Sequence, residues 1–179
     1  MIRALILAVL IYLALIAQEF LPAVPLLGGS HVLVVPLLFV YAALWLPFPG
    51  ILGFALYTGL LSDLTFLHAT GDQVEIGLGW SMLFYVFLGT ALRLLQPLAP
   101  GGRWEIHCLA SGLATSLLLL VQYLMVCLRR ESFLLDGTIL WQVSGPGLAA
   151  LMLAPPAYFF LRLFPGRPWS QPDRPGLTS

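Results

Sequence analysis

Few residues of this chain could carry out acid–base, nucleophilic or metal chemistry. Asp63 and Asp136 are the only candidates for a pair of catalytic carboxylates, and Asp136 is expected in a loop. The three histidines, His31, His68 and His107, fall near the ends of apolar runs, where a solvated imidazole needs no partner. No group of His, Cys, Asp or Glu has the spacing of a metal site, and no Gly-rich loop follows a strand to hold a phosphate. The sequence therefore predicts a non-enzymatic protein without a cofactor or a metal.

The segments of the chain that carry these residues are mostly apolar. Of the 179 residues, 60% are hydrophobic and 9% are charged, whereas an ordinary soluble domain is about 25% charged. A net charge of zero gives no basic stripe, so nucleic acid is not an expected partner. Apolar runs without strict alternation predict an all-α membrane protein of about six spans rather than a β-barrel. The runs are Ala4–Leu21, Val32–Leu46, Ile51–Leu67, Ile76–Leu95, Ile106–Leu128 and Ile139–Phe164.

The second run is shorter than the others. At about 1.5 Å per residue, Val32–Leu46 reaches about 22 Å of a hydrocarbon core about 30 Å thick. It could cross a locally thinned bilayer or re-enter, so arrangements with four or five spans stay open. The Pro-Phe-Pro-Gly sequence at 47–50 is expected to end this helix in a tight hairpin, and Pro146 and Pro155-Pro156 are expected to interrupt the last run.

The arginines orient the predicted spans. With six spans, six of the eight Arg residues fall on the side of the two chain ends, and only Arg129 and Arg130 fall on the other side. Both termini are therefore expected in the cytoplasm. Residues 1–164 are expected to form one transmembrane domain, followed by a Pro-rich cytoplasmic tail at 165–179.

Asp63 is the one acid expected inside a span. It lies four residues before the outer end of its run, about 6 Å deep, and such an acid by default marks a functional or packing site. Ser81, Gln122 and Ser144 fall at depths of about 6–9 Å on three later runs. This polar layer could line a cavity for a small ligand, form a groove for a partner's helix, or only tie the helices together.

Small residues share faces with this polar layer. Ala55, Gly59 and Asp63 repeat every four residues in one run, as do Gly77, Ser81, Tyr85 and Gly89 in the next. Such stripes let two helices approach closely. The two helices are therefore expected to pack tightly, with Asp63 accepting a hydrogen bond from Ser81 or Tyr85. A second candidate face for a partner helix is Ser111–Thr115–Gln122.

Several motifs of this chain occur together in one known family. They are an aromatic-rich segment at 39–47 that ends in Pro, Gly53-Phe54, and Gly59-x-x-x-Asp63-Leu64, with Ala154-Pro155-Pro156 closing the last run. In these features the chain resembles the MreD family of rod-shape-determining membrane proteins. Ser30-His31 at the start of the second run and the long acidic loop at 65–75 depart from the family pattern.

The resemblance implies a non-enzymatic component of the bacterial cell-elongation machinery in the inner membrane, surrounded by lipid. It implies a bundle like the substrate-binding S-components of energy-coupling-factor vitamin transporters. The implied partners are the single-span protein MreC, then MreB and the lateral-wall synthases, with a second copy of the chain as a further candidate. The residues expected in a partner or packing groove are Ala55, Gly59, Ser62, Asp63, Ser81, Tyr85 and Gln122.

A second function class stays open from the sequence. The chain could be the small-ligand-binding membrane subunit of an energy-coupling-factor type transporter. That function predicts a ligand-filled outer pocket and contact with a coupling subunit, whereas the first predicts association with a single-span protein that has a periplasmic domain.

Overall fold

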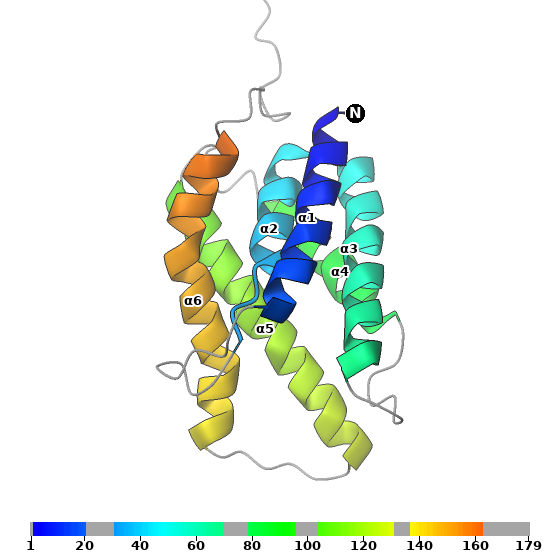
Figure 1. Ribbon diagram of the computed structural model, residues 1–179, viewed down its shortest axis with the longest axis vertical. Helices are drawn as coiled ribbons and strands as arrows, with labels where there is room; N and C mark the ends of the chain where they lie inside the picture. The colour runs from blue at the N-terminus through cyan, green and yellow to red at the C-terminus, as the bar shows by residue number, and fades with distance from the viewer. Residues whose placement is uncertain (1, 21–30, 70–78, 96–103, 131–136, 163–179) are drawn as a thin grey trace, which may run out of the picture.

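The computed structural model describes residues 2–20, 31–69, 79–95, 104–130 and 137–162. These residues form six helices and no strand, which confirms the all-helical fold class for the described part of the chain. The start of α1 and the end of α6 lie at the same end of the bundle (Figure 1). The predicted tail at 165–179 lies outside the described residues. The helices are α1 (Ile2–Phe20), α2 (Val35–Trp45), α3 (Phe48–Ala69), α4 (Trp80–Leu95), α5 (Trp104–Arg130) and α6 (Gly137–Arg162).

The short helix α2 lies at the centre of the bundle. It contacts each of the other five helices, and all residues from Val35 to Ala43 are buried. A helix that is apolar on every side is stable only when it is enclosed. Its 11 residues rise about 16 Å, which is about half of a bilayer core. The other helices therefore enclose α2 and extend beyond it.

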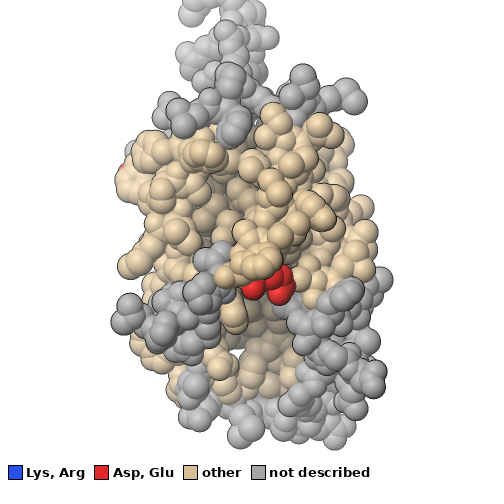
Figure 2. Space-filling model, in the orientation of Figure 1, with Lys and Arg blue, Asp and Glu red and all other residues tan. Residues whose placement is uncertain are grey.

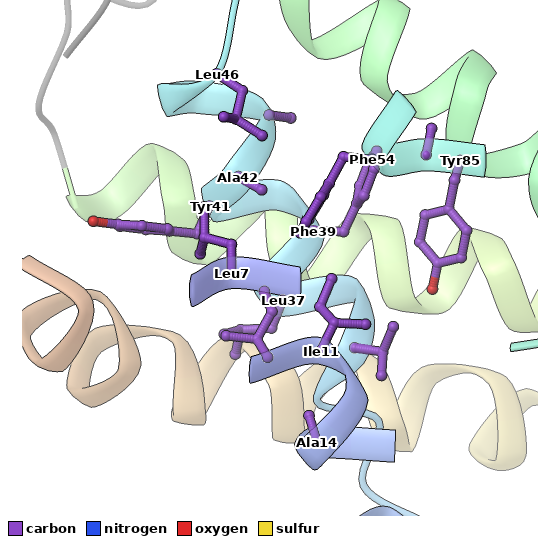
Figure 3. Close-up of a cluster of buried hydrophobic side chains, with 14 of the residues drawn as sticks. Leu7, Ile11, Ala14, Leu37, Phe39, Tyr41, Ala42, Leu46, Phe54 and Tyr85 are labelled. Atoms are coloured by element: carbon purple, nitrogen blue, oxygen red, sulfur yellow. The ribbon is translucent and has the colours of Figure 1, made fainter. Parts of the chain in front are cut away.

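The hydrophobic core is built around the side chains of α2. Phe39 packs on Phe54 of α3 and on Tyr85 of α4, with ring centroids 6.3 and 4.8 Å apart. On the other side of α2, Leu37 lies close to Ile11 of α1 (Figure 3). The core thus joins α1, α3 and α4 through α2.

The turn between α2 and α3 is tighter than predicted. Only Leu46 and Pro47 lie between the two helices, because α3 begins at Phe48 and takes in Pro49 and Gly50. Proline is tolerated in the first turn of a helix, where its missing N–H would have no intrahelical partner. The Pro47 carbonyl accepts the first bond of α3, from the Ile51 N–H at 2.9 Å. The predicted end of the second helix in a tight hairpin is confirmed, but Phe48, Pro49 and Gly50 belong to α3 and not to the turn.

The last run is one helix, so its predicted interruption was wrong. Pro146, Pro155 and Pro156 all lie inside α6, which is continuous from Gly137 to Arg162. Proline is found inside apolar, membrane-type helices because neighbouring helices and local adjustments satisfy the freed backbone groups.

Two helix pairs, α3 with α4 and α5 with α6, have the most extensive contacts in the described structure. In the second pair, the backbones meet at Gly112 and Gly147. A Cβ added at Gly147 would overlap the Ser116 side chain and lie 3.0 Å from the Gly112 carbonyl oxygen. Glycine is therefore what lets α5 and α6 approach this closely.

Among the described residues, two helical segments are long and apolar enough to cross a membrane, Trp104–Leu128 in α5 and Ile139–Leu161 in α6. Shorter apolar segments lie at Ala4–Phe20, Val35–Trp45 and Trp80–Leu95. The predicted start of the fourth run at Ile76 falls outside the described residues, and its helix begins at Trp80.

Candidate functional site

The face of α3 that carries Ala55, Gly59 and Asp63 packs against α4. A Cβ added at Gly59 would overlap the backbone of Met82 and lie 2.5 Å from its nitrogen. Ala55 and Asp63 are buried as well. The predicted close packing of these two helices is therefore confirmed. Because α4 occupies this face, it forms an internal contact and leaves no open groove for a partner's helix.

Asp63 holds the start of α4 through both of its carboxylate oxygens. Its Oδ2 accepts a hydrogen bond from the Gly79 N–H at 2.6 Å, and its Oδ1 accepts one from the Ser81 N–H at 3.3 Å. The residue is 4% exposed. The first N–H groups of a helix have no intrahelical partner, and a negative charge is favoured there. Asp63 thus caps α4 from the neighbouring helix.

Gly79 supplies the backbone conformation that this cap needs. Its φ is 105°, a left-handed value that side chains with a Cβ rarely adopt. The residue turns the chain into α4, and its carbonyl accepts a hydrogen bond from the Leu83 N–H at 3.1 Å. Gly79 was not among the residues predicted from the sequence, although a Gly just before a helical run signals such a turn.

The predicted donors to Asp63 are confirmed in part. Ser81 does donate to Asp63, but through its backbone N–H and not through its hydroxyl. Tyr85 does not bond to Asp63. Its hydroxyl is fully buried near Ser62 and Asp63, yet it meets no donor or acceptor in hydrogen-bonding geometry within the described part of the chain. The tyrosine ring is instead fixed by Phe39 and Phe84.

A cavity of about 250 Å³ lies beside this cap. It forms at the N-terminal end of α2, because α2 is too short to fill the space between its neighbours. Its polar lining comes from Gln18, Glu19, His31, Ser62, Thr65 and Tyr85, and its apolar lining comes from α1, α5 and the segment 32–36. Of the seven predicted site residues, the structure therefore brings Ser62 and Tyr85 to the cavity wall.

The polar layer predicted across four helices is only partly formed. Gln122 is half-buried, its amide nitrogen lacks a partner within the described structure, and it does not line the cavity. Ser144 is exposed and donates to the Leu140 carbonyl of its own helix at 2.6 Å. The assumption that equal depth brings residues together was wrong for Ser144, because depth does not fix the direction in which a helical side chain points.

The second candidate face for a partner helix, on α5, is also internal. Ser111 and Thr115 are fully buried, and the Thr115 hydroxyl donates to the Ser111 carbonyl at 2.8 Å. Both faces that the sequence offered to a partner are therefore used inside the bundle.

His107 is a buried residue, although its position near the end of an apolar run predicted a solvated side chain. It is fully buried, with its ring centroid 5.9 Å from that of Tyr41 and 5.5 Å from that of Tyr158. It lies on the inner face of α5 because α5 begins at Trp104, nearly one turn earlier. His31, by contrast, is exposed as expected, and the side chain of His68 lies outside the described residues.

Gln18 is a positioning residue that was not predicted from the sequence. Its side-chain oxygen accepts hydrogen bonds from the N–H groups of Val34 and Val35, at 2.7 and 2.9 Å. Gln18 therefore caps α2 from the end of α1. In the sequence, Gln18 is a single amide residue near the end of an apolar run. Nothing in that pattern identifies the backbone groups to which it bonds.

The described residues contain no group of three His, Cys, Asp or Glu that could hold a metal ion. Cys108 and Cys127 are free and buried. The candidate site is thus a capped helix start beside a small cavity.

The core is mostly apolar but contains several polar side chains, and many large apolar side chains are exposed. Buried side chains include Thr58, Ser62, Asp63, Ser81 and Thr115. Large apolar side chains are exposed on α1, α3, α4, α5 and α6, some of them by more than two-thirds of their surface. Figure 2 shows a face that is almost wholly uncharged in its described part, with one acidic spot near mid-height.

Comparison with models of known protein families, with curated proteins and with solved structures finds no match to this chain.

Proposed function

We propose that this chain is a multi-pass protein of the bacterial inner membrane, with both termini in the cytoplasm. The observation that carries the proposal is the exposure of large apolar side chains on five helices, while Asp63 and several hydroxyls are buried. An exposed apolar surface of this extent marks contact with lipid or with other proteins. The even number of helices in the described part of the chain and the shared end of α1 and α6 support the orientation that the arginines indicate.

We further propose that the protein belongs to the cell-elongation machinery and acts there by binding, without catalysis. The sequence motifs that resemble the MreD family support this role, and the geometry gives two of them a physical purpose. Gly59 allows the contact between α3 and α4, and Asp63 caps α4. Both residues are therefore needed to build the bundle, and a partner would bind to an outer face of it.

The absence of catalysis is proposed from the chemistry of the described residues. A catalytic site needs a nucleophile, a base and a group that orients the base, at mutual hydrogen-bond distance. Asp63 uses both carboxylate oxygens for the cap of α4. His107 is enclosed by aromatic rings, and no acid is bonded to it in the described structure. The proposed role is thus to hold a partner, MreC, and through it to couple MreB to the lateral-wall synthases.

Purification of the tagged chain from native membranes tests this proposal. We expect a single-span protein with a periplasmic domain to co-purify, and an unrelated multi-pass protein carrying the same tag not to retain it. Co-purification of a coupling subunit with its ATPases would instead support the transporter function. Recovery of neither partner would contradict the proposed role.

A further inference from the structure

The cavity beside Asp63 has the features of a built binding site. Its volume of about 250 Å³ exceeds the engineered apolar cavity of about 150 Å³ that takes up benzene. Glu19 and His31, which belong to its lining, are exposed. Its walls come from α1, α2, α3, α4 and α5, so the cavity is held by the same helices that form the core.

Tyr85 places an unsatisfied polar atom at the wall of this cavity. The residue is fully buried, and its hydroxyl lies close to Ser62 but makes no hydrogen bond of good geometry within the described structure. The ring packs on Phe39 and Phe84, and Figure 3 shows that the hydroxyl points toward neither Phe39 nor Phe54. A buried polar group without a partner is costly. A ligand or a water that bonds to this hydroxyl would remove that cost.

The charges around the cavity exclude an anionic ligand. A free helix N-terminus could attract an anion, but the Val34 and Val35 N–H groups already bond to Gln18, and Pro36 has no N–H. Among the described residues, no Arg lines the cavity, and Glu19 in its lining is acidic. A cation is also disfavoured inside, because apart from the exposed Glu19 and His31 the described lining is uncharged, and an unpaired buried charge is costly.

We propose that this cavity binds a small uncharged molecule of one or two rings that carries one hydrogen-bonding group. The apolar body would contact Leu15, Val35 and Leu118, and the polar group would meet the Tyr85 hydroxyl. The cavity is formed by the isolated chain, so ligand binding does not depend on the partner proposed above.

Binding of indole to the purified full-length protein tests the proposal. Indole is uncharged, has two fused rings and carries one N–H. We expect saturable binding in nanodiscs, measured by equilibrium dialysis against empty nanodiscs that correct for partition into lipid. Loss of one net hydrogen bond corresponds to a roughly fivefold weaker affinity, so Tyr85→Phe should weaken binding by about this factor. Tyr12→Phe is the matched control, because Tyr12 is exposed on α1 and does not line the cavity.

A second variant and two charged analogues complete the test. Ser62→Val, which narrows the cavity without removing Tyr85, should also weaken indole binding. Indole-3-acetate and tryptamine should bind less tightly than indole. The proposal is overturned if the wild-type chain shows no saturable binding, if Tyr85→Phe and Ser62→Val both bind as tightly as Tyr12→Phe, or if the anion binds as tightly as indole.

Discussion

Asp63 contributes to this molecule through two hydrogen bonds that join the consecutive helices α3 and α4. Its carboxylate bonds to the N–H groups of Gly79 and Ser81, which begin α4. Hydrogen bonds to a charged acceptor contribute about 1.5–3 kcal/mol, and a buried donor left without a partner is costly. An apolar environment strengthens both effects, because water cannot replace the lost acceptor.

We therefore expect Asp63→Ala to lower the free energy of unfolding by about 2–3 kcal/mol, since two buried N–H groups lose their acceptor. Asp63→Asn keeps one side-chain oxygen and should lose about half as much. Unfolding by SDS in mixed micelles measures both changes. Glu19→Ala is the control, because Glu19 is exposed at the end of α1 and makes no such bond in the described structure. Equal stability of Asp63→Ala and Glu19→Ala would show that the cap contributes nothing.

At the scale of the helices, glycine determines which helix faces can pack closely. Gly59 lies against the backbone of Met82, whereas Gly53 on the same helix has no atom within 4 Å of an added Cβ. The sequence predicts the first contact, because Gly59 belongs to a stripe of small residues at spacing four. It does not distinguish Gly59 from Gly53 by residue type, so the difference comes from the position of α4.

Gly59→Ala and Gly53→Ala form a matched pair of tests. We expect Gly59→Ala to lower the free energy of unfolding by about 1–3 kcal/mol, because the new methyl group forces α3 and α4 apart. Gly53→Ala should be neutral or stabilise by up to about 1 kcal/mol through helix propensity. Thermal unfolding of the two variants in detergent would compare them directly. A larger loss for Gly53→Ala than for Gly59→Ala would mean that these two helices do not pack as described.

The sequence predicts the helices better than it predicts their surroundings. Apolar runs locate all six helices, and the stripe of small residues predicts the contact of α3 with α4. The runs do not show that α2 is enclosed, because an apolar run looks the same whether lipid or protein surrounds it. They also misplace His107, because the earlier start of α5 moves that residue from the helix end to the interior.

The cavity could not be predicted from the sequence. It depends on the end of α2 and on the separation of the helices around it, and both are set by tertiary packing. Tyr85 was predicted from its stripe of small and polar residues and Ser62 as a residue of the expected groove, and both line the cavity. Gln18 caps α2 across a sequence separation of 16 residues. Residue type alone does not predict such a contact.

The molecule exposes large apolar side chains around a mostly apolar core that also contains a few buried polar groups. Phe87 on α4 is 74% exposed and Leu113 on α5 is 67% exposed, while Thr58 and Thr115 are fully buried. In water this arrangement would expose a large apolar surface, whereas in a bilayer the same surface is solvated by lipid. The proposed function therefore requires that the bundle lie within a membrane, with successive helices running in alternate directions.

Labelling of single cysteines from one side of the membrane tests that requirement most directly. Cys108 and Cys127 are first replaced by Ala, and then either Glu19→Cys at the end of α1 or Leu95→Cys at the end of α4 is introduced; both positions are exposed. In intact spheroplasts, a membrane-impermeant maleimide should label Glu19→Cys and should reach Leu95→Cys only after lysis. Labelling of both positions in intact spheroplasts, or of neither before lysis, would contradict the proposed arrangement.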